Sequence, residues 1–325
     1  MVKRKKLLAF ALALPLALTA CGGDDEGGGG GNGAAAGAGK DIKIAVVTHG
    51  NVGDAFWDVV KKGSETAGKD LGIDVSYQAD GDPQKQSQLI DNAVADKVDG
   101  LVVSMANPPA LKSSIEKAVS AGIPVITINS GVDQFKEYGA LTHVGQTETV
   151  AGEGAGEKLR EAGVTKLLCI VQEAGNVGLE QRCDGARKTL AGEVENLQVD
   201  GTNLEGSKAT IQGKLSSDKS FDGVLALGPG PATAARDAIA AAGSDAQLAN
   251  FDLNADVVKA IQDGDILFAV DQQQYEQGYL PVVFLYLYKT NLNTVGGGLP
   301  VLTGPGFVTK ENAAEVEDLA ADGTR

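Results

Sequence analysis

The stretch Asp54-Ala55-Phe56-Trp57 combines a carboxylate with two large aromatic rings. Asp54 is a typical helix N-cap residue, so Phe56 and Trp57 are expected in the first helical turn. Trp57 is the only tryptophan of the chain. Adjacent rings at such a turn can stack on the C–H faces of a sugar ring while the carboxylate accepts its hydroxyl protons. Because neighbouring helical residues point about 100° apart, the alternative is that one ring faces the core.

Three further polar residues lie at the ends of runs that are expected to be strands. Asn129 ends the run 124–129, Asp252 follows Phe251, and Gln272 follows the run 266–270 together with Asp271. An asparagine amide both donates and accepts hydrogen bonds, which suits a polyhydroxylated ligand, although asparagine also favours turns without any ligand. We expect Asn129, Asp252 and Gln272 to contact the same ligand.

A charged group follows the run 166–171. Glu173 is the second residue after this run, and Glu180 and Arg182 begin the next helical segment. A carboxylate and a guanidinium in this position can bracket hydroxyl groups, but a surface ion pair explains the pattern nearly as well.

Short apolar runs alternate with amphipathic segments over most of the chain. Strands are expected at 42–48, 75–78, 100–104, 124–129, 166–171, 223–227, 247–251 and 266–270, and helices at 54–71, 83–97, 109–121, 147–162, 179–190 and 231–242. Such alternation predicts βαβ units and parallel sheets that are covered on both faces. In open parallel sheets, ligands bind outside the carboxyl ends of the strands, which is where the polar residues above are expected.

The alternation occurs twice, at 43–130 and again at 165–251, with 138–146 as a candidate crossover. We therefore expect an α/β protein with two doubly wound, Rossmann-like parallel-sheet lobes. The segment 280–288 is apolar nearly all round but too short to span a bilayer, so a buried helix is expected there.

The first 40 residues have a different character. Four basic residues and an apolar run read as a secretory signal over residues 1–20. Leu18-Thr19-Ala20-Cys21 looks like a bacterial lipobox, in which Cys21 receives lipid; cleavage beside an incidental cysteine is the alternative. Residues 21–40 are glycine-rich and are expected to be a flexible tether. These features predict an extracytoplasmic protein that is lipid-anchored to the cell membrane.

The precursor has a net charge of −15, and loss of the four basic signal residues makes it more negative. Such a charge argues against nucleic acid or anionic lipid as a partner. Export permits Cys169 and Cys183 to form a disulfide, which would close a loop of about 15 residues. The alternative is two buried thiols.

Enzyme signatures are weak in this sequence. It has no G-x-S-x-G elbow and no Walker A motif, and His49 and His143 lie too far apart to suggest a helical metal pair. The loop 228–233 follows a strand but lacks the third glycine of a dinucleotide-binding fingerprint. We expect no enzymatic activity, no cofactor and no metal site.

Several stretches together resemble the type I periplasmic sugar-binding proteins, especially the ribose-, galactose- and inositol-binding branch. They are 53–57, 98–104, 121–129 and 250–252, together with Gln272. The resemblance implies two lobes joined by a three-strand hinge, with residues 41–142 and 273–301 in the N-terminal lobe and 143–272 and 302–325 in the C-terminal lobe. Where ribose-type relatives carry an Asp-Arg pair, this chain has Asn129-Ser130, and their helix-start arginine aligns with Glu180 or, with a small shift, Arg182.

The function that this resemblance implies is capture of a monosaccharide or polyol and its delivery to the permease of an ABC importer, by a monomeric receptor. An alternative is a sugar or autoinducer receptor for a membrane sensor, since the same fold serves both roles. An exported hydrolase is a further alternative, but it would need a catalytic serine, a carboxylate pair or a metal cluster.

Overall fold

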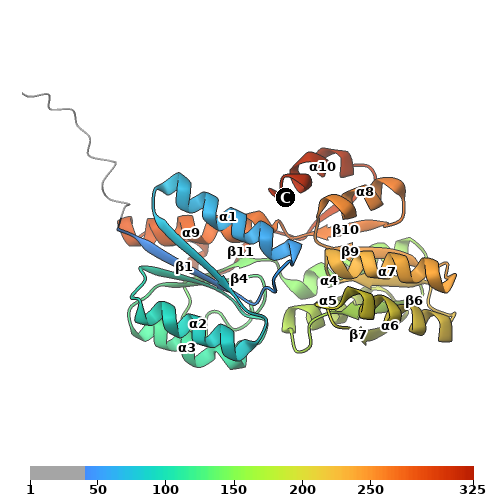
Figure 1. The fold of residues 1–325 in the computed structure, drawn as a ribbon, viewed down its shortest axis with the longest axis horizontal. Helices are drawn as coiled ribbons and strands as arrows, with labels where there is room; N and C mark the ends of the chain where they lie inside the picture. The colour runs from blue at the N-terminus through green and yellow to red at the C-terminus, as the bar shows by residue number, and fades with distance from the viewer. Residues whose placement is uncertain (1–40) are drawn as a thin grey trace, which may run out of the picture. The chain divides into compact units, whose positions relative to one another are not determined.

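The computed structural model describes residues 41–325. The predicted signal peptide (1–20), the lipidation residue Cys21 and the tether (21–40) lie outside the described residues. Within the described part, two six-stranded sheets each carry helices on both faces (Figure 1).

The first lobe is built on a parallel sheet with the strand order β11-β5-β4-β3-β1-β2. Its strands are β1 (Lys43–Thr48), β2 (Asp74–Ala79), β3 (Gly100–Ser104), β4 (Val125–Ile128), β5 (Thr142–Gly145) and β11 (Val301–Leu302), and its helices are α1 (Ala55–Leu71), α2 (Pro83–Ala95), α3 (Pro108–Ser120) and α9 (Gln274–Asn291). Figure 1 shows α1 and α9 side by side on one face of this sheet and α2 and α3 on the other.

The second lobe repeats this arrangement with the order β12-β10-β9-β8-β6-β7, in which only β12 is antiparallel to its neighbour. Its strands are β6 (Lys166–Val171), β7 (Glu193–Gln198), β8 (Gly223–Ala226), β9 (Gln247–Phe251), β10 (Phe268–Asp271) and β12 (Gly306–Thr309), and its helices are α4 (Glu148–Glu161), α5 (Val177–Thr189), α6 (Leu204–Ser217), α7 (Pro229–Ala242), α8 (Ala255–Asp263) and α10 (Ala313–Ala321).

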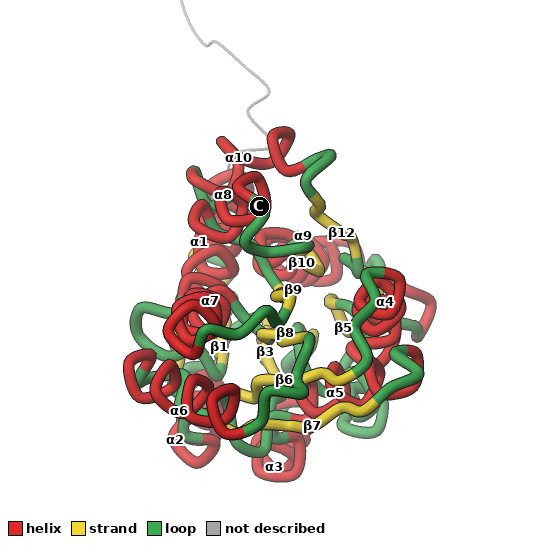
Figure 2. The backbone as a smooth tube through the Cα atoms, turned by 90° about the vertical axis from the view of Figure 1, so that its right-hand side faces the viewer, coloured by secondary structure: helices red, strands yellow, loops and turns green. Residues whose placement is uncertain are grey.

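Successive residues of a strand point to opposite faces of its sheet, and both faces are buried here. On β6, Leu168 and Ile170 pack with α6 and α7, whereas Leu167 and Cys169 pack with α4 and α5. Figure 2 shows these two helix pairs on opposite sides of the strands. The near-continuous apolar composition of the strands follows from this double coverage.

The chain passes between the two sheets three times, at 146–147, 272–273 and 303–305. Hydrogen bonds tie the second passage to the third: Thr303 Oγ1 donates to the Gln272 carbonyl at 2.7 Å, and Gln273 Nε2 donates to the Thr303 carbonyl at 2.6 Å. The lobe boundaries at 142 and 301 stay predictions, and both fall within strands of the first sheet.

Several elements differ from the sequence-based expectation. Strands β7, β11 and β12 and helices α6, α8 and α10 were not expected. Among them, β7 is a polar edge strand and α6 has only a weak apolar stripe. The candidate crossover 138–146 contains β5. The apolar segment 280–288 is part of the longer helix α9, which buries one side only. Within residues 41–325, every helix lacks the length or the apolar composition that a membrane span requires.

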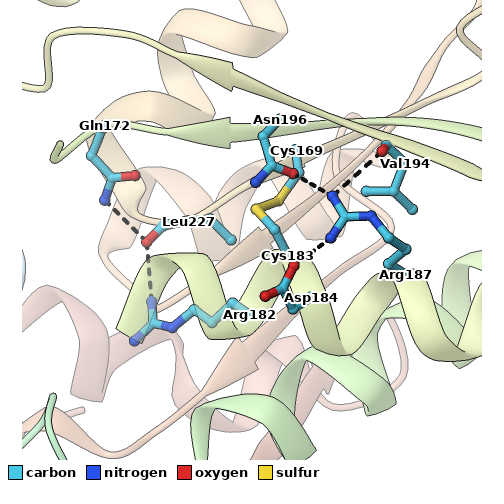
Figure 3. The surroundings of a disulfide bond; sticks show 9 residues. All are labelled: Cys169, Gln172, Arg182, Cys183, Asp184, Arg187, Val194, Asn196 and Leu227. Atoms are coloured by element: carbon cyan, nitrogen blue, oxygen red, sulfur yellow. Dashed lines mark hydrogen bonds and ion pairs between the residues drawn. A yellow bond between two sulfur atoms is a disulfide. The ribbon is translucent and has the colours of Figure 1, made fainter. Parts of the chain in front are cut away.

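Cys169 on β6 and Cys183 on α5 form a disulfide, with their Cα atoms 5.9 Å apart (Figure 3). Both residues are fully buried in the layer between the second sheet and α4 and α5. The bond therefore fixes the first turns of α5 against the strand that precedes it.

Candidate ligand-binding site

A cavity of about 490 Å³ lies at the carboxyl ends of both sheets, and residues of both lobes line it. Eight of the nine residues predicted to bind ligand are among them: Asp54, Phe56, Trp57, Asn129, Glu173, Arg182, Asp252 and Gln272. The volume lies within the range of about 300–1,000 Å³ that is typical of small-molecule sites.

Glu180 is the predicted residue that does not line this cavity. It is exposed on α5, whereas Arg182 is buried on the same helix. Residues two apart in a helix point about 200° away from each other around the axis, so only one of these two side chains can point into the space between the lobes. We therefore leave Glu180 out of the proposed contacts.

The aromatic wall of the cavity is built at the start of α1. Asp54 caps this helix by accepting a hydrogen bond from the Phe56 N–H at 3.0 Å. The Trp57 ring stands edge-on to Phe56 at 4.9 Å and to His49 at 4.6 Å between centroids. A Cβ atom on Gly50 would lie 2.5 Å from Trp57 Cγ, so the ring position requires glycine there. Both rings belong to the core and also line the cavity, so packing in the core does not remove them from the candidate site.

An amide bridge crosses the cavity at the second passage between the lobes. Gln272 Nε2 donates to Asp252 Oδ1 at 2.7 Å, and Gln272 Oε1 accepts from Asn129 Nδ2 at 3.2 Å. Gln277 on α9 donates to the same Oε1 at 2.9 Å, which fixes the orientation of the Gln272 amide. Two cavity-lining groups, one from each lobe, are thus held by one side chain.

Asn129 and Asp252 occupy equivalent turns in the two lobes. Each directly follows its strand, has a left-handed backbone (φ of 60° and 72°), and donates its N–H to a carbonyl of the next strand. This φ region is strained for most residues but is several-fold enriched in Asn and Asp. The residue types therefore fit the turn as well as the cavity.

Arg182 is held from three sides. Its guanidinium forms two hydrogen bonds with Glu148, at 2.6 and 3.1 Å, and donates to the Leu227 carbonyl at 3.2 Å, the latter shown in Figure 3. It lies 4.6 Å from the centroid of the Phe251 ring and 3.8 Å from Asp252 Oδ2. Arg182 is thus a fixed positive charge beside Asp252 and not a mobile side chain.

Burial perturbs the ionisable groups of the site. It raises the pKa of Asp252 to about 7 against the opposing charge of Arg182, and it raises the pKa of Asp54 to about 6 with help from the charge of Glu173. Burial, followed by the charge of Arg182, lowers the pKa of His49 to about 3. The imidazole is therefore neutral at physiological pH.

His49, Asn176 and Glu148 were missed as site residues from the sequence. His49 Nδ1 lies 2.7 Å from Ser104 Oγ, and His49 Nε2 lies 3.7 Å from Glu173 Oε2 in the other lobe. Asn176 caps α5 and donates to Glu173 at 2.7 Å. His49 and Asn176 could have been found, because both follow strands at the carboxyl edge. Glu148 had no such signal, since its role depends on a partner 34 residues away.

Direct contacts between the lobes flank the cavity on the side of α5. The Val177 N–H donates to the Ala106 carbonyl at 3.0 Å, and Ser130 Oγ donates to Asn176 Oδ1 at 3.3 Å. A Cβ atom on Gly178 would lie 2.8 Å from Ser130 Oγ. Glycine at 178 therefore allows α5 to approach the first lobe this closely.

Comparison with known proteins places this architecture in a family. The model of the periplasmic binding protein domain matches residues 44–291. A crystal structure of a carbohydrate transporter from Acidothermus cellulolyticus 11B, in complex with myo-inositol, is 44% identical and superposes with a TM-score of 0.86, covering 87% of this chain and 99% of that one.

The names of more distant relatives describe them as sugar-binding proteins. The xylose/arabinose-binding protein XylF of Sulfolobus acidocaldarius is 23% identical over 74% of this chain, and the match spans 65% of that protein, just under two thirds of its length. The ribose import binding protein RbsB of Bacillus subtilis is 24% identical over 67% of this chain and 72% of its own length. The family model covers most of the chain and both lobes have the expected topology, so the chain belongs to the periplasmic binding proteins, with the type I fold.

Proposed function

We propose that this chain is an extracytoplasmic receptor that binds a cyclic polyol or monosaccharide between its lobes and delivers it to the permease of an ABC importer. The observation that carries the proposal is the cavity in which an aromatic wall from one lobe faces carboxylate and amide groups from both. The myo-inositol in the 44% identical structure supports a cyclitol as the ligand. Lipid on Cys21 would keep the receptor at the membrane.

The free hydrogen-bonding capacity of the cavity favours a ligand rich in hydroxyl groups. Within residues 41–325, Asp54 and Glu173 each accept hydrogen bonds through only one carboxylate oxygen. In the same part of the chain, Asp252 Oδ2 has only the 3.8 Å contact with Arg182. The remaining oxygens are acceptors that suit hydroxyl donors. Trp57 offers an apolar face to the C–H groups of the same ring.

Binding would favour the closed arrangement because the ligand touches both lobes at once. Asn129 approaches it from the first lobe and Asp252 from the second, with Gln272 between them at the hinge. The closed lobe pair is the form that we propose is handed to the permease, and no bond of the ligand is made or broken.

The single tryptophan makes the proposal directly testable, since Trp57 lines the cavity. Titration with myo-inositol, its isomers, D-ribose, D-xylose and D-glucose should produce a saturable change in intrinsic fluorescence with at least one of them. The same compound at 100 times its Kd should raise the free energy of unfolding by about 2.7 kcal/mol. Glu180→Gln, an exposed change on α5, is the control and should bind normally. A panel in which no compound changes fluorescence or melting temperature would refute a sugar or polyol ligand.

Blocking the close approach at Gly178 should weaken binding without unfolding either lobe. Gly178→Val places atoms against Ser130 of the other lobe, and overpacking of this kind costs about 1–3 kcal/mol. Most of this cost falls on the closed arrangement, because the contact within the same lobe, with Asn176 Oδ1, is longer, at 3.3 Å. The Kd measured by calorimetry should rise by about tenfold to a hundredfold. Gly213→Val on α6, where a Cβ meets no atom within 4 Å, is the matched control. An unchanged Kd for Gly178→Val would show that the lobes bind ligand without this contact.

Affinity should rise with pH if Asp252 accepts a ligand hydroxyl. Burial in the closed arrangement raises its pKa to about 7, so this carboxyl is largely protonated there below pH 7 when no ligand is bound, and a donated hydroxyl favours the ionised form. The Kd should therefore increase toward about tenfold per pH unit as the pH falls below 7, because the proton must leave on binding. Calorimetry in buffers of different ionisation enthalpy measures that proton. Asp252→Asn should remove this part of the dependence; a Kd that is constant between about pH 8 and about pH 5 would contradict the role.

A further inference from the structure

The cavity extends beyond the groups described above. Val52 of the first lobe lines it, as do several residues of the second lobe. We call this part of the cavity the outer cleft and define it by six residues: Val52, Thr202, Leu204, Pro229, Gly230 and Pro231. Val52 is fully exposed and the Leu204 residue is 41% exposed, so these two apolar side chains mark the mouth of the cavity between the lobes.

The volume of the cavity exceeds what one ring needs. About 490 Å³ lies in the range that encloses drug-sized ligands, which are larger than a single pyranose or cyclitol. A ring held by Trp57, Asn129 and Asp252 would occupy the inner part, where these side chains are buried. The outer cleft remains available for another part of the ligand.

The wall of the outer cleft is made largely of C–H groups. Pro229 and Pro231 are buried at the start of α7 and have no N–H to donate. A Cβ atom on Gly230 would lie 3.3 Å from Leu204 Cδ2, so Leu204 packs over this glycine. Thr202 is exposed at the rim, and its hydroxyl group, which donates to Asp200 Oδ1 at 2.6 Å, keeps a free acceptor site. A surface of C–H groups edged by a hydroxyl suits the face of a second sugar ring.

The charges of the cavity exclude an anionic substituent. Arg182 is the one lysine or arginine that lines it within residues 41–325, and Glu148 already engages its guanidinium at 2.6 and 3.1 Å. Asp256 adds an exposed carboxylate to those of Asp54, Glu173 and Asp252. A phosphate or carboxylate on the ligand would meet like charge without a free cation.

We propose that the outer cleft binds a second, neutral ring that is joined to the inner ring by a glycosidic bond. The ligand class is then a glycosylated cyclitol or a disaccharide, with Pro229, Pro231 and Leu204 against the C–H face of the outer ring. This inference rests on the proposed function, because it assigns the inner ring to the site of Trp57 and Asp252.

The test compares two pairs of probes by calorimetry: myo-inositol with 1-O-α-D-galactosyl-myo-inositol, and D-glucose with maltose. In the wild type, the glycosylated member of at least one pair should bind as tightly as its bare ring or more tightly. Gly230→Leu fills the outer cleft beside Leu204 and should raise the Kd of that glycosylated probe at least about tenfold, while the Kd of the bare ring stays within about twofold. Gly213→Leu on α6, away from the cavity, is the matched control and should change neither.

The outcomes separate this inference from the proposed function. Binding of a bare ring with no binding of its glycosylated partner overturns the outer-ring site and leaves the proposed function standing. Equal weakening of both members by Gly230→Leu also overturns it, because the outer cleft would then not be selective. Failure of every probe, bare or glycosylated, overturns both.

Discussion

Replacing Arg182 with leucine lowers the free energy of unfolding by about 3–5 kcal/mol at neutral pH, because it leaves buried carboxylates without their counter-charge. The Glu148 side chain is 0% exposed and that of Asp252 is 4% exposed, and both lie beside the guanidinium. Desolvation of an unpaired carboxylate is the source of the cost. Chemical denaturation monitored by circular dichroism measures the change.

A control on the same helix separates this effect from a general loss of arginine. Arg187 pairs with Asp184 on the exposed side of α5, so Arg187→Leu should cost less than about 1 kcal/mol. The double variant Arg182→Leu/Glu148→Leu removes both partners and should be more stable than Arg182→Leu alone. If Arg182→Leu lowered the free energy of unfolding no more than Arg187→Leu does, the Arg182 guanidinium would not be needed to stabilise the buried carboxylates.

Removing the disulfide should lower the free energy of unfolding by about 3 kcal/mol under oxidising conditions. Cys169 and Cys183 are 14 residues apart, and a cross-link over such a loop restricts the unfolded chain. Chemical denaturation compares the free energies of unfolding of the oxidised wild type, the reduced wild type and the double variant Cys169→Ala/Cys183→Ala. The double variant and the reduced wild type should unfold at similar denaturant concentrations, and both below the oxidised protein.

Mass spectrometry after alkylation tests directly whether Cys169 and Cys183 are covalently bonded. Alkylation of the native or denatured, unreduced protein should leave Cys169 and Cys183 unlabelled, and labelling should appear after reduction. Labelling of both before reduction, or identical denaturation curves for oxidised and reduced protein, would contradict a stabilising bond. An exported location is consistent with such a bond, since it persists in oxidising compartments.

The order of most elements from β1 to β10 was predictable because local patterns encode it. Apolar runs that are buried on both faces, such as β1 and β6, produce a strong strand signal. The edge strand β7 and helix α6 produced none, because their residues are largely polar and few of them reach the core. Helix α9 was found only in its apolar part, since its first turns read as polar.

Much of the candidate site was also predictable, for a topological reason. Asn129, Asp252 and Gln272 each directly follow a strand, and Trp57 lies in the first turn of the helix after β1. Parallel strands bring their carboxyl ends to one edge of a sheet. A residue type at a strand end is visible in the sequence, and the fold class then implies that these residues meet.

Residue patterns along the chain were enough to predict the α/β alternation and the sheet edge where the cavity lies. Only the folded arrangement reveals that Arg182 turns inward to Glu148 while Glu180 faces solvent, that His49 reaches Glu173 across the lobes, and that Gly178 packs on Ser130. These contacts join residues from different elements, and most join different lobes. Their formation depends on helix rotation and on the approach of two separately folded sheets, which no local pattern of residues encodes.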